Sequence, residues 1–248
     1  MTPTAKRISK PHLPAYPAYR PSGLEWVPEI PEHWDVRKLK HIASVTFSNV
    51  DKHSDDGEVP VRLCNYTDVY YNDYITPDIE FMEATAAPEE IRKFKLRSGD
   101  VLVTKDSEEW SDIAVPAHVS ADLDGVLCGY HLALIRPHPE IIYGAYLFRA
   151  FAARGINDQF RVAATGITRY GLGKYSLDNA LFPVPPPDVQ RSIAAFLDRK
   201  TKMIDRLVEK IRYLVGEVSE NKASLLREYR TALISAAVTG KINVREGA

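Results

Sequence analysis

The chain has 248 residues, a formal net charge of −1, 45% apolar residues and 26% charged residues. These are ordinary globular values, and they exclude collagen-like, coil-only and wholly disordered chains. No apolar run approaches the roughly 20 residues that a membrane-spanning helix needs, and residues 1–10 lack the apolar core of a secretory signal. The two cysteines, Cys64 and Cys128, cannot build a disulfide framework or a four-thiolate zinc site. We therefore expect a cytoplasmic protein that contacts no membrane.

The near-zero net charge hides an uneven distribution. Residues 51–125 hold 18 acidic and 7 basic side chains, whereas residues 141–187 carry a net charge of +3 and residues 188–248 one of +4. A surface that binds an anion should therefore draw on the second half of the chain. Random scatter of charges is the alternative interpretation.

Proline marks off the first segment of the chain. Seven of the 17 prolines lie in residues 1–31. Proline fixes φ, restrains the residue before it and removes an amide donor, so this segment is expected to be an extended leader without helix or strand.

Residues 32–187 have the pattern of one mixed α/β domain. Alternating or continuous apolar residues predict strands at 59–63, 101–103, 113–115 and 126–135. Helices are predicted from Pro88, where two acids follow the proline, and over 141–154, with Gly155 as the C-cap. A proline cluster at 183–187 closes the domain.

Residues 188–239 are predicted to form one long helix, followed by a tail at 240–248. A helix from 188 to 238 would be about 75 Å long, more than the diameter of the preceding domain. Its apolar seam consists of Leu197, Ile204, Leu207, Ile211, Leu214, Val218 and Leu225. Such a seam needs a partner helix, so these residues are expected to form a coiled coil with a second chain. The predicted fold class is α+β.

Catalytic signatures are absent from the sequence. It contains no phosphate-binding loop, no dinucleotide-binding glycine motif and no nucleophile elbow, and its seven histidines show no metal spacing. His131 lies in an apolar run, which favours a core histidine with satisfied hydrogen bonds. We expect no catalytic residue, metal or cofactor in this chain.

A glycine-rich loop at 161–175 is the main binding candidate. Its polar residues are Arg161, Thr165, Thr168, Arg169, Tyr170 and Lys174, and Gly166 is one of the interleaved glycines. Glycines allow close approach of a ligand, arginine and lysine neutralise phosphate or donate to guanine, and threonine and tyrosine donate to phosphate. On composition alone, a plain solvated surface loop is the favoured interpretation.

A second polar loop, 104–112, follows the strand at 101–103. Lys105, Ser107 and Trp110 are its candidate DNA contacts. Its acids would repel phosphate, although a carboxylate can accept a hydrogen bond from cytosine N4 in the major groove. The alternative is that Trp110 packs back onto the domain.

Several segments together resemble the specificity subunits of type I restriction–modification systems. The opening of that family is similar to residues 21–39, PSGLEWVPEIPEHWDVRKL. Its target recognition domain is similar to 99–106 (GDVLVTKD), 129–137 (GYHLALIRP) and 164–172 (ATGITRYGL). Its spacer helix and C-terminal end are similar to 185–198 (PPPDVQRSIAAFLD) and 228–242 (EYRTALISAAVTGKI). The resemblance covers nearly the whole of residues 21–245.

The resemblance implies a non-catalytic reader of double-stranded DNA. One recognition domain would read one half of a split target, while antiparallel helices would fix the distance between halves and dock methyltransferase subunits. S-adenosylmethionine, ATP and Mg²⁺ would be bound by the partner methyltransferase and restriction subunits, and this chain would bind no cofactor. The alternative is a coiled-coil protein-interaction module with a globular head and no role at DNA.

Two features depart from the family pattern. Val189-Gln190 stands where the family usually has Glu-Gln, which removes a carboxylate near a helix N-terminus. The sequence also contains one recognition domain and one helix where the family usually has two of each. It therefore resembles a half-size subunit, whose partner would be a second copy or a different half-subunit.

Overall fold

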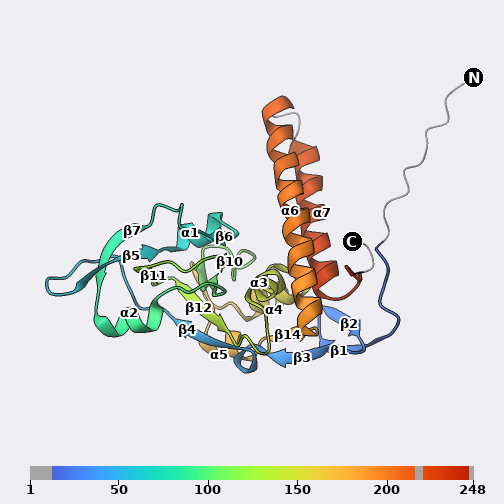
Figure 1. The fold of residues 1–248 in the computed structure, drawn as a ribbon, viewed down its shortest axis with the longest axis horizontal. Helices are drawn as coiled ribbons and strands as arrows, with labels where there is room; N and C mark the ends of the chain where they lie inside the picture. Colours follow the sequence, from blue (N-terminus) through green and yellow to red (C-terminus); the bar gives the residue numbers. More distant parts are fainter. Residues whose placement is uncertain (1–12, 216–219, 246–248) are drawn as a thin grey trace, which may run out of the picture.

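The computed structural model describes residues 13–215 and 220–245. It shows a mixed α/β head and two long helices that project from it side by side (Figure 1). The predicted α+β fold class is confirmed. Within the described residues, no helix is both long and apolar enough to span a bilayer.

A five-stranded sheet forms the centre of the head, with the strand order β4-β12-β8-β10-β6. The bounds are β4 Ala43–Phe47, β12 Leu132–Pro137, β8 Val101–Thr104, β10 Pro116–Val119 and β6 Tyr74–Ile75. All pairs are antiparallel except β10 with β6. Every residue of β8 is buried, because this strand is central and both of its faces are covered.

A second sheet, β11-β5-β7, packs beside the first one and encloses a second apolar cluster. Its strands are β11 Val126–Cys128, β5 Val59–Cys64 and β7 Met82–Ala86. Helix α2 Pro88–Phe94 contacts β11, whereas helix α1 Tyr66–Tyr71 packs against the first sheet. The strand predicted at 59–63 and the helix predicted from Pro88 are confirmed. The apolar run 126–135 divides between two sheets, and the strand predicted at 113–115 lies instead at 116–119.

The expectation that residues 1–31 form no strand is wrong for the described part. Strands β1 Tyr19–Leu24 and β2 Val27–Pro31 pair as an antiparallel hairpin. A two-stranded ribbon has only edge strands, where proline is tolerated because the amide it lacks would face solvent. The tail packs on the hairpin and on the segment before it: the Tyr19 hydroxyl donates to the Gly240 carbonyl at 2.9 Å, and the Asn243 amide donates to the Pro14 carbonyl at 2.7 Å.

Short helices complete the head, together with one more strand pair. They are η1 Leu39–His41, α3 Gly144–Ala152, α4 Arg154–Ala163 and α5 Lys174–Asn179, and strand β14 Leu181–Val184 pairs with β3 Asp35–Lys38. Gly155 lies inside α4, so its predicted role as a C-cap is wrong. A Cβ there would lie 2.9 Å from Val27 Cγ2, so close packing against β2 is what favours glycine.

The single helix predicted over 188–239 is two helices. Helices α6 Pro187–Val215 and α7 Glu220–Val238 run antiparallel, so α7 returns to the head, where Ile234, Ala237 and Val238 are buried. The apolar stripe changes face after Asn221, and this shift gives α7 an apolar face for the head. The chain thus supplies the partner helix that we expected from a second molecule.

The predicted seam is correspondingly divided. Leu197 and Ile204 are buried within this chain, Ile211 is half-buried, and Leu207, Leu214 and Leu225 are exposed. Val218 lies outside the described residues. The exposed leucines are the part of the seam that remains available to another molecule.

Candidate nucleic-acid interface

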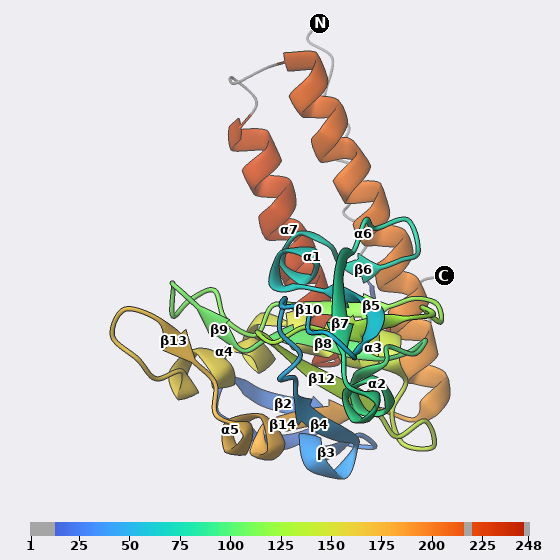
Figure 2. The same cartoon turned by 90° about the vertical axis from the view of Figure 1, so that its left-hand side faces the viewer.

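The two polar loops singled out in the sequence lie together in the structure. Strand β9 Asp106–Ser107 pairs with β13 Tyr170–Gly171, with Tyr170 opposite Ser107. The Leu172 amide also donates to the Lys105 carbonyl at 2.8 Å. Segments about 60 residues apart in the sequence therefore form one surface at the side of the head (Figure 2).

The segment 165–171 is a tight loop that projects from this surface. Thr165 and Gly171 exchange both backbone hydrogen bonds, at 3.1 and 2.8 Å. Gly166 has φ +143°, and a Cβ there would lie 2.0 Å from the Arg169 carbonyl oxygen, so only glycine fits. The loop carries Ile167, which is 94% exposed, at its tip beside the exposed Thr168 and Arg169.

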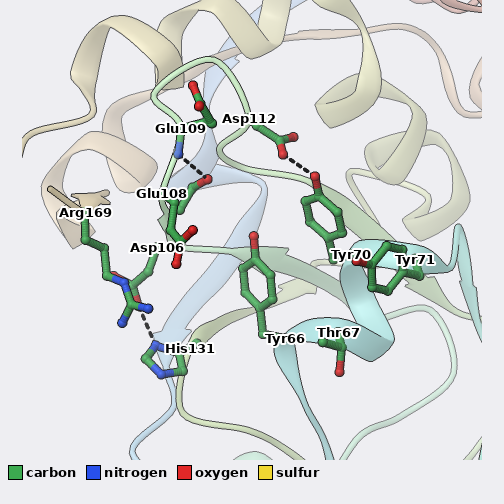
Figure 3. Close-up of a pocket in the computed structure, with 11 residues that line it drawn as sticks. Tyr66, Thr67, Tyr70, Tyr71, Asp106, Glu108, Glu109, Asp112, His131 and Arg169 are labelled. Carbon is green, nitrogen blue, oxygen red and sulfur yellow. Dashed lines mark hydrogen bonds and ion pairs between the residues drawn. The ribbon is translucent and has the colours of Figure 1, made fainter.

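Helix α1 provides a third wall, made of tyrosines. Asn65 and Asp68 form a capping box that starts this short helix. The rings of Tyr66 and Tyr70 stack with centroids 5.4 Å apart, and Tyr71 meets Tyr70 edge-on at 5.0 Å. A cavity of about 480 Å³ lies between the helix and the two loops, lined by Tyr66, Thr67, Tyr70, Tyr71, Asp106, Ser107, Glu108, Glu109, Asp112, His131 and Arg169 (Figure 3).

Asp106 lies at the edge of this cavity, where two nitrogen-bearing side chains contact its carboxylate. Lys105 Nζ lies 2.7 Å and His131 Nδ1 2.9 Å from its Oδ2. Burial acts to raise the pKa of Asp106, but the hydrogen bonds from Lys105 and His131 outweigh it and hold the pKa below its usual value. His131 is thus a half-exposed partner of a carboxylate, and the expectation of a core histidine is wrong. Lys105 is only 13% exposed and lies over the Tyr130 ring, so it positions Asp106.

The tyrosines supply hydroxyl groups to the same cavity. The Tyr70 hydroxyl donates to Asp112, and this hydrogen bond is the main reason why its pKa is raised to about 12. Burial raises the pKa of Tyr66. Both hydroxyls are therefore protonated donors at neutral pH. Among the described residues, neither Glu108 nor Glu109 forms an ion pair, so two exposed carboxylates remain as hydrogen-bond acceptors.

The predicted basic residues differ in their availability. Arg161 lies on α4 and pairs with Asp158 at 3.2 Å, and Lys174 opens α5 and pairs with Asp178 at 2.6 Å, so neither is a loop residue. Arg169 is exposed, faces the cavity and has no ion pair within the part of the chain that the structure describes.

The remaining predicted contacts divide in the same way. Thr165 and Thr168 are exposed, Trp110 is 53% exposed and Tyr170 is half-buried. Ser107 is buried, and its hydroxyl accepts a hydrogen bond from the Glu109 amide at 3.1 Å. Trp110 therefore does not pack fully back onto the domain.

Sequence reasoning missed the tyrosine wall and His131. Tyr66 and Tyr70 are four residues apart directly after a strand, which is the spacing that stacks two rings on one helix face. That signal was available in the sequence. Their meeting with the two loops was not, because it depends on long-range strand pairing. Among the described residues, no cluster of potential ligands could hold a metal ion.

Comparisons relate this chain to known proteins. The model of the type I restriction modification DNA specificity domain matches residues 31–214, more than half of the chain. A protein of Methanocaldococcus jannaschii, named as the specificity subunit of the type I restriction enzyme MjaX, is 25% identical over 75% of this chain and 44% of its own length.

Two solved structures share the fold. One comes from a structural study of complex assembly and conformational transition of the type I R-M system. It has a TM-score of 0.52 at 17% identity, and the match covers 86% of this chain and 47% of that chain. The HsdS subunit of Thermoanaerobacter tengcongensis has a TM-score of 0.52 at 21% identity, covering 79% and 48%. The chain spans about half the length of these relatives.

Proposed function

Because the chain belongs to the type I restriction–modification DNA specificity family, we propose that it recognises the base sequence of double-stranded DNA and is not itself catalytic. One observation carries the proposal: two polar loops and a tyrosine helix converge on one projecting surface, and that surface presents the exposed Arg169, which forms no ion pair among the described residues. Protein side chains read sequence in the major groove through donors and acceptors at base edges.

The side chains of the surface have the chemistry for such reading. Arg169 can donate two hydrogen bonds to guanine, and Ile167 at the loop tip can contact a thymine methyl group. Glu108 and Glu109 can accept from an exocyclic amino group, while the exposed threonines can donate to phosphates. The acids limit where phosphate can lie, so they favour contact with base edges over contact with the DNA backbone.

The projecting helices support proposals about partners. In the proposal, methyltransferase subunits dock on α6 and α7, and the head reads one half of a bipartite target. S-adenosylmethionine, ATP and Mg²⁺ belong to the methyltransferase and restriction subunits. The exposed Leu207, Leu214 and Leu225 supply an apolar face for a second copy of this chain or a different half-subunit.

The test is recognition of DNA by the assembled complex. The chain is combined with type I methyltransferase subunits from the same organism, and methylated sites are identified by sequencing. We expect one defined target, and binding of a duplex that contains it should weaken steeply with salt. Failure to find salt-sensitive duplex binding would favour the alternative of a protein-interaction module, which the acidic side chains around the cavity also favour.

A further inference from the structure

A charge network centred on one fully buried arginine joins the head to the base of the two projecting helices. Its members are Asp73 and Tyr74 beside and within β6, Arg149 on α3, Asp198 on α6 and Arg230 on α7. We call these five residues the clamp. In Figure 1, α3 lies against the lower ends of both long helices.

Arg149 is the centre of the clamp and its side chain is 0% exposed. Its Nη2 lies 2.8 Å from Asp198 Oδ1, 2.8 Å from the Tyr74 hydroxyl and 3.1 Å from Thr201 Oγ1. The Tyr74 hydroxyl donates to the same Asp198 oxygen at 2.6 Å. Burial raises the pKa of Tyr74, so this hydroxyl stays protonated and remains a donor.

Asp73 connects this centre to the second helix. Its Oδ2 lies 3.6 Å from Arg149 Nη1 and accepts a hydrogen bond from Arg230 on α7. Arg230 also lies beside Asp205 of α6, with Nε 3.2 Å from Oδ1. Each of the two guanidinium groups therefore meets one carboxylate of the head and one of α6, and the clamp ties the head to both helices.

The ion pairs of the clamp depend on the direction in which their side chains meet, whereas the surrounding apolar packing does not. Leu197 and Ile204 bury apolar surface between the helices and the head, and such contact tolerates small rotations. Rotation would instead leave Arg149 unpaired between the rings of Phe148 and Tyr74. An unpaired charge in apolar surroundings is strongly unfavourable, so the network admits one orientation of the helices.

Because the clamp lies at the base of the helices, a change in their orientation there displaces their far ends. Helix α6 continues from Asp198 to Val215, about 26 Å at 1.5 Å per residue. A rotation of about 10° at the clamp would move the far end by about 4–5 Å, more than the ~3.4 Å rise of one base pair. A small change in the helix angle at the clamp therefore displaces the far end of α6 by more than one base pair.

We propose that the clamp is a positioning device that sets the angle between the recognition head and the helices, and thereby the spacing of the DNA target. The effect on DNA rests on the function proposed above. The effect on the angle does not, because it concerns this chain alone.

The angle is measured by pulsed EPR. Nitroxides are placed at Tyr175→Cys on α5 and Tyr213→Cys on α6, two exposed sites outside the clamp; the native cysteines are buried. Labelled protein is diluted with unlabelled protein to remove distances between molecules. The test variant is Arg149→Met with Asp198→Leu, which removes the pair without leaving a lone buried charge. Asp198→Asn is a milder second variant in case the first does not fold.

The matched control is Arg136→Met with Asp100→Asn, which likewise removes an ion pair without leaving a lone buried charge. Arg136 donates to the largely buried Asp100 at 2.8 Å, but both residues lie in the head. We expect one narrow distance distribution for the unsubstituted protein and the control, and a broadened or shifted one for the clamp variants. An unchanged distribution in a folded clamp variant, verified by circular dichroism, would overturn the proposal.

The DNA experiment measures methylation of targets whose spacers differ by one base pair, using the assembled complex. We expect the clamp variant to lose about tenfold in discrimination between spacers, while the control keeps it. A broadened distance distribution with unchanged spacer discrimination would overturn the assignment of spacing to the clamp. If the complex with the unsubstituted chain methylates no defined site, the proposed function fails. The EPR result alone then decides whether the clamp sets the angle between the head and the helices.

Discussion

Arg169 differs from the other basic residues of the proposed interface because no carboxylate of the described chain holds it. Arg161 and Lys174 pair with acids of their own helices. Replacing Arg169 by alanine should therefore relax sequence preference at one base pair, at a cost of about 1–3 kcal/mol in binding free energy. The measurement is binding to duplexes that carry each base pair at each position.

Arg92→Ala is the control for that experiment, since Arg92 is an exposed arginine on α2 whose neighbour Glu89 lies 3.8 Å away. It removes the same charge without touching the loops. Uniform weakening across all duplexes in Arg169→Ala would mean that Arg169 contacts phosphate, and no change at all would remove it from the interface.

Asp106 gives a prediction about pH. Its pKa in the folded protein is held below the ordinary value of 3.8, so its ionised form stabilises the fold. That contribution is complete above the unfolded pKa and is lost as the pH falls through the lower folded pKa. Asp106→Asn should cost about 1–2 kcal/mol of unfolding free energy at pH 7, and the difference should shrink below about pH 4.

Urea unfolding at several pH values measures this effect. Asp35→Asn is the control, because Asp35 pairs with Arg37 in the open at 2.8 Å and exposed pairs contribute little. A stability difference for Asp106→Asn that stays constant from pH 7 to pH 3 would contradict the assigned role of the carboxylate.

At the scale of elements, the two long helices leave an apolar face uncovered. Leu207, Leu214 and Leu225 are exposed on α6 and α7. If they pair with a second copy, Leu207→Lys should place a charge in the contact and raise the dimer dissociation constant at least about tenfold. Light scattering over a range of concentrations measures this change.

Tyr175→Lys is the matched control, since Tyr175 is exposed as well but lies on the head. It should leave the mass unchanged. A clean monomer of the unsubstituted chain at tens of micromolar would rule out self-association and leave the face to a different subunit.

At the scale of the whole molecule, symmetry predicts the form of the target. Two copies related by a two-fold axis carry identical recognition heads, which must read the same half-sequence in opposite directions. A complex with this chain as its sole specificity component should therefore methylate an interrupted palindrome. Sequencing of methylated sites in cells that express only this chain and the methyltransferase subunit provides the measurement; an asymmetric target would contradict the two-fold arrangement.

The residue patterns determined several of the helices and strands whose signal was local. The strand at 59–63 and the helix from Pro88 follow from alternation and from a proline–acid start, which depend only on neighbouring residues. The α+β class, the basic character of the second half and the loop around Gly166 were accessible in the same way. The resemblance to specificity subunits was carried by motifs spread along the chain.

Only the tertiary structure decided which of these segments meet. The pairing of Ser107 with Tyr170, the tyrosine wall beside Asp106 and the contact of Arg149 with Asp198 each join residues far apart in sequence. The same holds for the return of α7 onto the head, which replaces one long helix by two. Local propensity and periodicity describe what an element is, but its partner depends on the burial of surfaces and charges contributed by the rest of the chain, and no short segment encodes that choice.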